Sequence, residues 1–434
     1  MKILMSAFSC GPGQGSEPGV GWNVALAAAR MGHEVTVFTQ TEFKEDIDRE
    51  LASGTLPANL HFDIFTPAWL EKLRDIGLRF GVPSLTWQTV SLIWQFCALS
   101  HARRHYDLAA FDVVHHVTFA GIRHPTLLTQ LGIPTVIGPL GGGDSVPMTL
   151  RKSFPWREWW SELVRDAYNV SLRIDPITHS AFRHARLIVL RTDASLVAVP
   201  PRYRDKVYIK GGLGIAETIS PKVRRRSTGE PLRLLYAGNL FHLKGVHLGI
   251  RALASARAHG ADATLTIVGS GPARGGLEEL TQRLGISAHV TWYEAVSRQQ
   301  LLDMYAGYHA FLFPSLRDAF GTVILEAWGH GLPVICLALG GPGQLVDDRC
   351  GRLVAAANRS EDECVAGLCA AIEALAKDED LRIALSYGAI KRYRESSWST
   401  VVSDLYGIIE DRLQHRGTRC SSPAPHYSFG SHAS

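Results

Sequence analysis

The sequence has no cysteine pair of the Cys-x-x-Cys type, although it contains seven cysteines. The seven are scattered along the chain, at positions 10, 97, 336, 350, 364, 369 and 420. Disulfide frameworks and cysteine-rich structural zinc sites both require regular spacing of their cysteines. We therefore expect neither of these, and a reducing, cytoplasmic environment.

Long hydrophobic runs are also lacking. No stretch approaches the roughly 18 to 20 apolar residues of a membrane span, and the best candidate, residues 91–100, is short and is followed by His101, Arg103 and Arg104. Residues 1–10 have only about half the apolar length of a signal-peptide core and lead directly into a glycine loop. We expect neither a membrane span nor a signal peptide.

Excess charge of one sign is missing as well. The net charge is +4 over 434 residues, so there is no general case for a nucleic-acid partner. An apolar fraction of 46% and a charged fraction of 20% are those of a soluble globular protein. The length exceeds the size at which one core usually stops growing, so we expect two domains.

Two series of alternating strands and helices follow one another along the chain. Strands are predicted at 2–8, 33–39, 111–117, 134–140, 185–190 and 205–210, and then at 231–239, 263–271, 289–296, 309–315 and 332–341. Short strand–helix–strand links imply parallel strands with right-handed crossovers. The predicted fold class is therefore α/β, with two doubly wound Rossmann-like domains.

The loop "GPGQGSEPGVGW" (11–22) follows the first strand and precedes a helix predicted at 21–32. Its five glycines allow a ligand to approach the backbone closely. It lacks the dinucleotide fingerprint, because Ser16 stands where a third glycine is needed and the second strand ends in Thr39 and Gln40 rather than an acid. The alternative is an ordinary glycine-rich surface turn.

Two further loops have the features of a phosphate site, in which helix N-termini offer free N–H groups. In "YAGNLFHLKGVHLGI" (236–250), Lys244 opens a helix and can neutralise charge on a leaving phosphate. In "LRDAFGTVILEAWGHGLPVI" (316–335), Asp318 precedes a helix and Glu326 lies about 11 Å further along it. One extended ligand could meet both acids, whose oxygens suit sugar hydroxyls. Alternatively, Asp318 is a helix cap and Glu326 a salt-bridge partner.

The ordered set of motifs resembles the retaining glycosyltransferases of family 4, which have the GT-B fold. The motifs are the glycine loop, "DVVHH", "AGNLFHLKG", "VGSGP", "YEAVSRQQLLDMYAGYHAFLFPS", "DAFGTVILEAWGHGLPVI" and "GGPGQLVDDRCGRLV", and they extend to about residue 413. The segment "GSEPGVGW" is similar to the N-terminal loop of a bacterial branch of that family. The resemblance implies that two Rossmann-like domains face a cleft and that a nucleotide-sugar donor is held mainly by the second.

The resemblance also assigns roles to individual residues. Lys244, His116 and Asp318 are the expected catalytic residues; Lys244 would stabilise the diphosphate leaving group, and the other two would contact the donor sugar. The expected nucleotide-sugar-binding residues are Gly13, Gln14, Gly15, Asn239, Gly269, Ser270, Arg274, Ala295, Val296, Phe320, Gly321, Thr322 and Glu326. Glu326 would bind the ribose hydroxyls, and the base would lie near Gly269, Ser270, Ala295 and Val296. No cofactor is expected.

Two positions depart from the family pattern. The first acid is usually Glu, and here it is Asp318, which is one methylene shorter. The family also has an Arg where this chain has Asn239, so that one cation of the phosphate site is lacking, and His242 or Arg274 are the candidate replacements. His115 and His116 point in opposite directions along a strand, so at most one faces the cleft. No Asp-x-Asp motif stands at a suitable strand end, so no metal is expected.

The expected domain boundaries follow the same resemblance. An acceptor-side domain is expected over residues 1–215, a linker over 216–230 and a nucleotide-sugar domain over 231–396. A helix at 397–414 would return to the first domain, and a disordered tail would follow at 415–434. The linker arginines, Arg224 to Arg226, are expected to be a solvated face.

Seven of the ten tryptophans lie in the first 160 residues. "RKSFPWREWWSELVR" (151–165) and "TWQTVSLIWQFCALSHARRHYD" (86–107) mix basic and aromatic residues, a blend typical of membrane interfaces. These segments predict peripheral membrane contact of the N-terminal domain, at the inner face of the cytoplasmic membrane, with a glycan or lipid-linked acceptor. Alternatively, the aromatics pack helices against the sheet or line a sugar site.

The expected activity is transfer of a sugar from a nucleotide diphosphate to an acceptor hydroxyl, with retention of configuration, in bacterial polysaccharide or glycolipid biosynthesis. The enzymatic alternatives with this fold are a nucleotide-sugar epimerase and a phosphorylase, although no residue marks the cofactor lysine that a phosphorylase needs. A non-catalytic nucleotide-sugar-binding homologue is the alternative from another class, because an Arg and a Glu of the family pattern are replaced.

Overall fold

The computed structural model describes residues 1–80, 83–210, 214–216 and 219–414, and the chain divides into two compact units. Unit 1 comprises Met1–Gly143, Asn169–Lys210 and the chain from Trp398 onward, and unit 2 comprises Asp144–Tyr168 and Gly211–Ser397. Residues 144–168, expected in the first domain, are thus grouped with unit 2. The predicted tail, 415–434, and residues 217–218 of the predicted linker lie outside the described residues.

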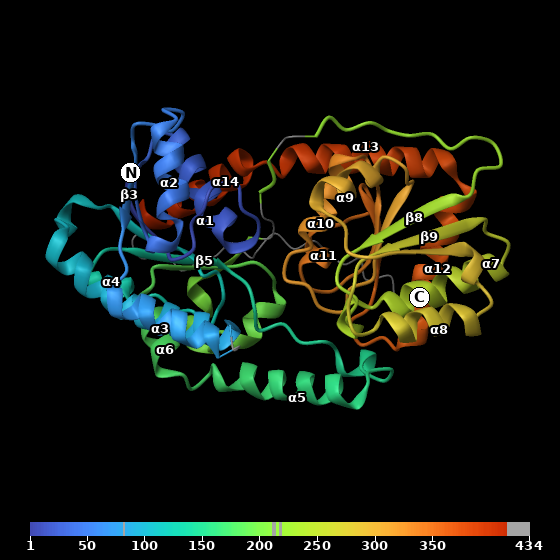
Figure 1. Cartoon of the computed structure of the whole chain (residues 1–434), viewed down its shortest axis with the longest axis horizontal. Helices are drawn as coiled ribbons and strands as arrows, with labels where there is room; N and C mark the ends of the chain where they lie inside the picture. The colour runs from blue at the N-terminus through green and yellow to red at the C-terminus, as the bar shows by residue number, and fades with distance from the viewer. Residues whose placement is uncertain (81–82, 211–213, 217–218, 415–434) are drawn as a thin grey trace. The chain divides into compact units, whose positions relative to one another are not determined.

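Unit 1, whose elements run from blue to green in Figure 1 with α14 in red, contains a seven-stranded parallel sheet with strand order β3-β2-β1-β4-β5-β6-β7. The strands are β1 (Lys2–Ala7), β2 (Glu34–Thr39), β3 (Leu60–Ile64), β4 (Val113–Thr118), β5 (Thr135–Leu140), β6 (Leu187–Leu190) and β7 (Val207–Ile209). The helices are α1 (Ser16–Arg30), α2 (Lys44–Ala52), α3 (Ala68–Arg79), α4 (Pro83–His105), α6 (Pro176–His184) and α14 (Trp398–Gln414).

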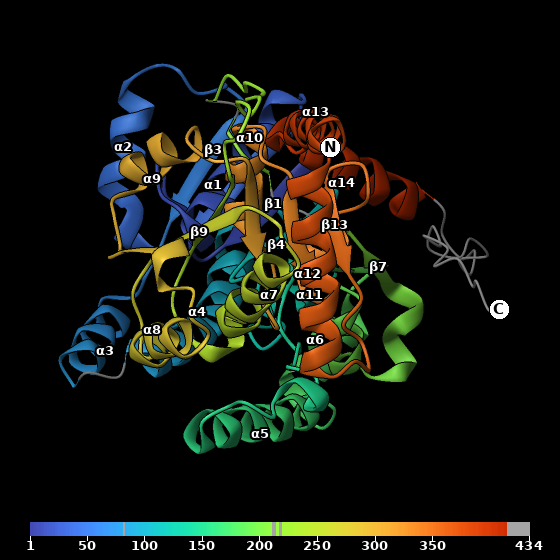
Figure 2. The same ribbon diagram turned by 90° about the vertical axis from the view of Figure 1, so that its right-hand side faces the viewer.

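Unit 2 contains a six-stranded parallel sheet with strand order β10-β9-β8-β11-β12-β13. The strands are β8 (Leu232–Ala237), β9 (Ala263–Val268), β10 (Val290–Tyr293), β11 (Ala310–Phe313), β12 (Val334–Leu337) and β13 (Gly351–Val354). The helices are α7 (Val246–Ala258), α8 (Arg274–Arg283), α9 (Arg298–Tyr305), α10 (Thr322–Gly329), α11 (Gly340–Leu345), α12 (Glu361–Lys377) and α13 (Glu379–Glu395). Helix α5 (Trp156–Ser171) belongs to unit 2 as far as Tyr168. In Figure 2, α7 and α12 lie side by side.

Both sheets are doubly wound, so the predicted α/β fold class is confirmed. The central strands are buried along their whole length, as parallel strands covered on both faces should be. Strand order reverses between β1 and β4 in unit 1 and between β8 and β11 in unit 2, which marks the carboxyl edge at these points as the ligand side of each sheet. Two strands that the sequence analysis did not predict, β3 and β13, form sheet edges.

Helix α1 begins at Ser16, five residues before the predicted start at 21, so most of the glycine loop is helical. The glycines are needed for packing: a Cβ on Gly19 would lie 2.2 Å from the Gln14 carbonyl oxygen, and one on Gly21 would lie 2.3 Å from that of Ser9. Close backbone approach, and not ligand contact, therefore accounts for these two glycines.

The C-terminal helix α14 belongs to unit 1 and contacts α1, as the fold prediction required. Tyr406 of α14 donates its hydroxyl proton to His115 Nδ1 at 2.9 Å, while His115 Nε2 donates to the Gly138 carbonyl oxygen at 2.8 Å. Burial lowers the pKa of His115 to about 4, so the ring is neutral and structural.

Two of the three linker arginines are only partly exposed and form close ion pairs, which corrects the prediction of a solvated face. Arg224 pairs with Glu230 at 2.7 Å, and Arg226 pairs with Glu379 of α13 at 2.7 Å. Arg225 is the exposed one of the three, and its Nη1 lies 3.7 Å from the exposed carboxylate of Asp380 on α13. The linker is thus attached to unit 2 by ion pairs.

No helix among the described residues is long and apolar enough to cross a membrane. The six cysteines in the described part of the chain are free, and Cys420 lies outside it.

Candidate functional site

A pocket of about 330 Å³ lies at the carboxyl edge of the second sheet, within unit 2. Its walls come from the loops after β8 and β11, from the start of α10 and from Leu301 of α9. Seven of the predicted site residues line it: Asn239, Lys244, Asp318, Phe320, Gly321, Thr322 and Glu326. The structure therefore brings the three chemically most informative residues of the prediction, Lys244, Asp318 and Glu326, to one place.

A larger pocket of about 980 Å³ lies in unit 1, but at the wrong edge of the sheet. Its lining includes Met1, Asp112, Pro134 and Arg186, each of which stands just before a strand. Doubly wound sheets bind their ligands beyond the carboxyl ends of the strands. We therefore assign the site to the smaller pocket.

The Asp318 carboxylate is the best-connected group of the pocket. Its Oδ2 accepts a hydrogen bond from Lys244 Nζ at 2.6 Å, and its Oδ1 accepts the backbone N–H groups of Phe320 and Gly321 at 2.9 and 2.7 Å. The Asp318 carbonyl oxygen accepts the N–H of Gly341 at 2.8 Å. One residue thus joins the starts of α7, α10 and α11.

Burial alone would raise the pKa of Asp318, but its partners outweigh that effect. The charge and hydrogen bond of Lys244, together with the two backbone N–H groups, hold the pKa below its ordinary value. Asp318 is therefore an anion at neutral pH, paired with the Lys244 ammonium inside a mostly buried site.

Glycines allow the loops of the pocket to pack closely. Gly245, with φ +64°, ends the loop that carries Lys244, and a Cβ there would lie 2.0 Å from the Pro314 carbonyl oxygen. A Cβ on Gly269, with φ +150°, would lie 2.0 Å from the Gly238 carbonyl oxygen. These contacts hold the ends of β8, β9 and β11 together, and larger residues would separate them.

Glu326 projects from α10 into the same pocket and pairs with Arg298, the first residue of α9. Arg298 Nη2 lies 3.1 Å from Glu326 Oε1. The sequence analysis did not single out Arg298, since the two residues are 28 positions apart and no motif marks the pair. The structural alternative raised by the sequence is therefore also met, since Asp318 forms a turn and Glu326 forms an ion pair. Both acids nevertheless line the pocket.

The two candidate replacements for the second phosphate-binding cation that the resemblance implies do not line the pocket. Arg274 pairs with Glu278 at 2.8 Å and with Glu294 at 2.7 Å. His242 Nδ1 lies 3.0 Å from Glu158 of α5. Of the described residues that line the pocket, Lys244 is the one cation. At the family's Arg position, the Asn239 carbonyl oxygen accepts the hydroxyl proton of Tyr236 at 2.9 Å.

The residues predicted to hold the base lie on the neighbouring strand ends. Gly269 and Ser270 follow β9, and the Ser270 carbonyl oxygen accepts the N–H of Leu240 at 2.9 Å. Ala295 and Val296 follow β10, and Val296 packs against the core of unit 2. None of these four lines the pocket as the structure defines it.

The predicted site residues of the N-terminal part lie in unit 1. Gly15 is the N-cap residue of α1, Gly13 has φ +67°, and Gln14 Nε2 donates to Asp46 of α2 at 3.3 Å. His116 is fully buried: its Nε2 donates to the His124 carbonyl oxygen at 3.2 Å, and its Nδ1 accepts from Ser6 Oγ at 3.1 Å. Burial lowers the pKa of His116 to about 3. Both ring nitrogens are thus engaged within unit 1, and the ring is neutral.

Helix α5 is attached next to the pocket by a pair that the sequence analysis missed. Arg317, adjacent to Asp318, donates from Nη1 to both carboxylate oxygens of Glu162 at 2.7 Å. Glu162 is buried, and Arg317 is mostly so. The acids of the basic–aromatic segment, Glu158 and Glu162, therefore face unit 2.

Part of unit 2 is similar to a known protein family. Residues 220–392 match the family Glycosyl transferases group 1. The matched segment contains every residue that lines the pocket.

The relatives and solved structures extend the likeness beyond that segment. A D-inositol 3-phosphate glycosyltransferase of Rhodococcus jostii is 26% identical over 91% of this chain and 84% of its own length. The protein of that name from Stackebrandtia nassauensis is 29% identical over 52% of this chain, and the match spans only 51% of the relative. The crystal structure of Anabaena HepE with UDP and glucose has a TM-score of 0.54 at 16% identity, covering 95% of this chain and 100% of that one. The fold is GT-B.

The Lys244–Asp318 pair leads to a prediction about stability and pH. We expect Asp318→Asn to lower the free energy of unfolding by about 1–3 kcal/mol at neutral pH, because the charged hydrogen bond with Lys244 is lost. Since the folded-state pKa of Asp318 lies below the ordinary value of about 3.9, the stabilisation is complete above that pH and is lost as the pH falls through the folded-state pKa. Urea unfolding at neutral pH and at progressively lower pH measures this.

The matched control is Asp348→Asn, which neutralises an exposed acid 3.7 Å from Arg352. We expect it to change stability little. An equal loss of unfolding free energy in both variants would contradict the assigned Lys244–Asp318 ion pair. So would a stability difference between wild type and Asp318→Asn that does not decrease at low pH.

Proposed function

We propose that this chain is a retaining glycosyltransferase of family 4 that transfers a sugar from a nucleotide-diphosphate sugar to an acceptor hydroxyl. The observation that carries the proposal is the convergence of Lys244, Asp318 and Glu326 on one pocket at the N-terminus of α10. A cation, a helix N-terminus and two acids are the groups that a diphosphate linked to two sugars requires.

The comparisons support the donor class. The solved structure of HepE contains UDP and glucose, and the relatives are named as glycosyltransferases. The proposal includes the family 4 assignment and its "GSEPGVGW" form of the N-terminal loop. It also includes a role in bacterial polysaccharide or glycolipid biosynthesis and a cytoplasmic location.

The proposed roles follow from the contacts. Lys244 Nζ donates one hydrogen bond to Asp318 and has further N–H groups for the diphosphate, whose negative charge grows as it leaves. Asp318 accepts a hydrogen bond from a hydroxyl of the donor sugar, and Glu326 accepts hydrogen bonds from the ribose hydroxyls. The bond between the anomeric carbon and the diphosphate oxygen breaks, the acceptor oxygen bonds on the same face, and its proton passes to the departing phosphate. The reaction is proposed to need no metal ion.

Replacement of Glu326 tests the nucleotide site. We expect one nucleotide among UDP, GDP and ADP to raise the melting temperature of the wild-type protein, and Glu326→Ala to abolish that shift, because the ribose hydroxyls lose their acceptor. Thermal unfolding with each nucleotide and its common sugars is the measurement.

The control for this experiment is Glu279→Ala on the exposed side of α8, which should keep the full shift. A nucleotide shift that survives in Glu326→Ala refutes the assigned role of Glu326. No shift with any nucleotide would refute the donor site as a whole.

Replacement of Lys244 distinguishes a transferase from a protein that only binds its ligand. We expect Lys244→Met to lower kcat by roughly 10²–10³-fold while the selected nucleotide still binds, since the lysine acts most strongly on the charge that develops in the transition state. Nucleotide release from the donor sugar, including its slow transfer to water, can be followed without knowledge of the acceptor.

Lys391→Met, which changes an exposed lysine of α13, is the matched control and should leave the rate unchanged. Binding of a donor by the wild-type protein without any turnover would identify the non-catalytic homologue instead. A changed sugar in the recovered donor would identify an epimerase.

The proposed acceptor is lipid-linked and is reached at an anionic membrane surface. On α5 the acids face inward, whereas the exposed apolar residues Trp156, Trp160 and Val164 follow one another at four-residue spacing. The exposed charged residues beside them, Lys152 and Arg157, are basic. An apolar stripe with basic neighbours suits the interface of an anionic bilayer.

The other basic–aromatic segment, residues 86–107, supports the packing alternative instead. Trp94 of α4 is fully buried in unit 1, and its Nε1 donates to the Phe65 carbonyl oxygen at 2.8 Å. The membrane proposal therefore rests on α5 alone.

Vesicle sedimentation tests this surface. We expect the protein to bind vesicles that contain anionic lipid, to bind neutral vesicles more weakly, and to lose most of its binding when Trp156 and Trp160 are both changed to Ser. Tyr387→Ser, at an exposed position of α13, is the control and should bind as the wild type does. Equal binding by the double variant would refute the role of α5.

A further inference from the structure

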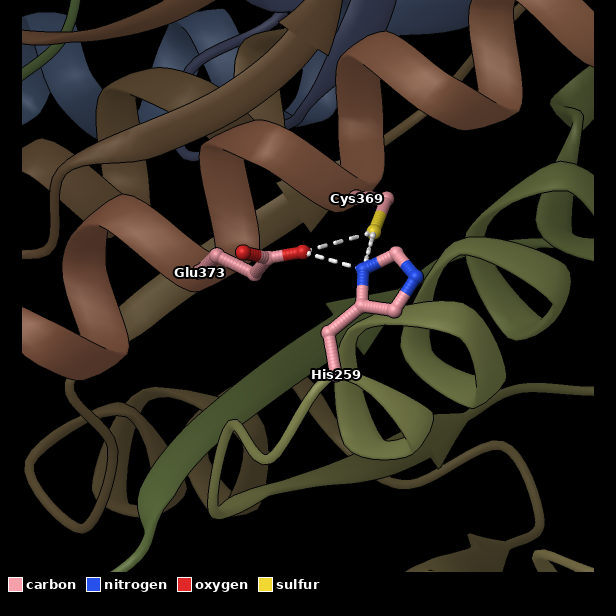
Figure 3. Close-up of side chains that lie close together, drawn as sticks. All are labelled: His259, Cys369 and Glu373. Atoms are coloured by element: carbon pink, nitrogen blue, oxygen red, sulfur yellow. Dashed lines mark hydrogen bonds and ion pairs between the residues drawn. The ribbon is translucent and has the colours of Figure 1, made fainter.

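Three side chains of different chemistry converge between the end of α7 and the middle of α12 (Figure 3). His259 Nδ1 lies 2.7 Å from Glu373 Oε1, and Cys369 Sγ lies 3.2 Å from the same oxygen and 3.9 Å from His259 Nδ1. Among the residues that the structure describes, this is the one group of three or more His, Cys, Asp or Glu donor atoms that all lie within 4.8 Å of one another.

The local fold holds these donors in place. Cys369 and Glu373 are four residues apart on α12, so they lie on the same face of the helix. His259 is the C-cap residue of α7, and its backbone N–H donates to the Ser255 carbonyl oxygen at 3.1 Å. Because α7 and α12 pack against each other, the imidazole meets the cysteine and the carboxylate from the opposite side.

The donor set is that of a zinc ion. A tetrahedral Zn²⁺ with bonds of about 2.0–2.3 Å to nitrogen, oxygen and sulfur separates its ligand atoms by about 3.3–3.8 Å. The observed separations of 2.7, 3.2 and 3.9 Å lie on both sides of that range. His259 is 62% exposed and can move by the few tenths of an ångström required. Thiolate and imidazole ligands favour zinc over the oxygen-seeking Mg²⁺ and Ca²⁺.

We propose that His259 Nδ1, Cys369 Sγ and Glu373 Oε1 bind one Zn²⁺ ion, with water as the fourth ligand. This inference goes beyond the proposed function, since no reaction step involves the ion. The cysteine spacing gives no indication of such a site, because two of its three ligands are not cysteines and His259 is 110 residues from Cys369.

Proton and charge balance are consistent with the site. Without the ion, the Cys369 thiol donates its proton to Glu373 Oε1; zinc takes the thiolate, and that proton passes to solvent. Without the ion, His259 Nδ1–H donates to Glu373 Oε1; when zinc binds at Nδ1 that proton also passes to solvent, and the neutral imidazole carries its proton on Nε2. Lys377 Nζ binds the other carboxylate oxygen, Oε2, at 2.8 Å and so leaves Oε1 for the metal. The two anionic ligands neutralise the ion.

The position indicates a structural role. Helix α7 starts beside Lys244 and has 13 residues, so His259 is about 20 Å along the helix from the nucleotide pocket. A zinc ion there would tie the end of α7 to α12 and stabilise unit 2, while the donor site at the other end of α7 would be unaffected.

The experiment uses the reduced full-length chain, freed of metal with a chelator, and titrates it with Zn²⁺ and with Co²⁺. The variants are His259→Gln and Cys369→Ser; the first changes an exposed side chain and keeps the fold. The matched control is Cys364→Ser, another buried cysteine of α12. Because other histidines and cysteines of the chain can also bind zinc, the result is read as the difference between variants.

We expect the wild type and Cys364→Ser to bind one equivalent of Zn²⁺ with the same affinity. His259→Gln and Cys369→Ser should bind that equivalent at least about tenfold more weakly. Co²⁺ should give a thiolate charge-transfer band and the visible spectrum of tetrahedral cobalt, and Zn²⁺ should raise the melting temperature of the wild type but not of His259→Gln. Zinc binding of equal strength in His259→Gln or Cys369→Ser, or cobalt binding without a thiolate band, would overturn the proposal.

Discussion

Asp318 fixes the carboxyl edge of the second sheet, because its carboxylate and its backbone carbonyl bond to segments that follow three different strands. Its bonds reach Lys244 after β8, the N–H groups of Phe320 and Gly321 after β11, and, through its carbonyl oxygen, Gly341 after β12. A carboxylate on a short side chain bonds readily to N–H groups two and three residues further on, which makes a compact turn. A glutamate would extend further into the pocket. Asp318, in place of the Glu that the sequence resemblance led us to expect, thus favours this turn.

The central strands were predictable, whereas two of the four edge strands, β3 and β13, were not. Runs such as "AFLF" in β11 and "VICL" in β12 are apolar throughout because both faces are covered. The edge strands β3, "LHFDI", and β13, "GRLV", include polar residues since one side of an edge is open to solvent. Helix α1 was predicted too short because Gly19 and Gly21 resemble loop residues, although they pack the helix closely against the backbone of residues 9–14.

Part of the candidate site was predictable because its residues stand at strand ends, where a ligand binds in this fold. Lys244 and Asp318 lie in loops that follow strands, Glu326 lies one turn into the helix after Asp318, and all three line one pocket. Their partners could not be predicted: Arg298 is 28 residues from Glu326, and Glu162 is 155 residues from Arg317, so neither pair leaves a periodic signal. Composition likewise showed that segment 151–165 is basic and aromatic, but not that its acids turn inward and attach it to unit 2.

In the proposed reaction, the two ion pairs of the pocket must behave differently when a donor binds. Breaking the Glu326–Arg298 pair costs little free energy, because Arg298 is 67% exposed and exposed ion pairs contribute little to stability. Glu326 can therefore exchange its partner for ribose hydroxyls without loss of structure. The Lys244–Asp318 pair is largely buried, and separating it would leave an uncompensated charge. It should persist through binding, so that Lys244 meets the diphosphate with its remaining N–H groups while Asp318 keeps it aligned.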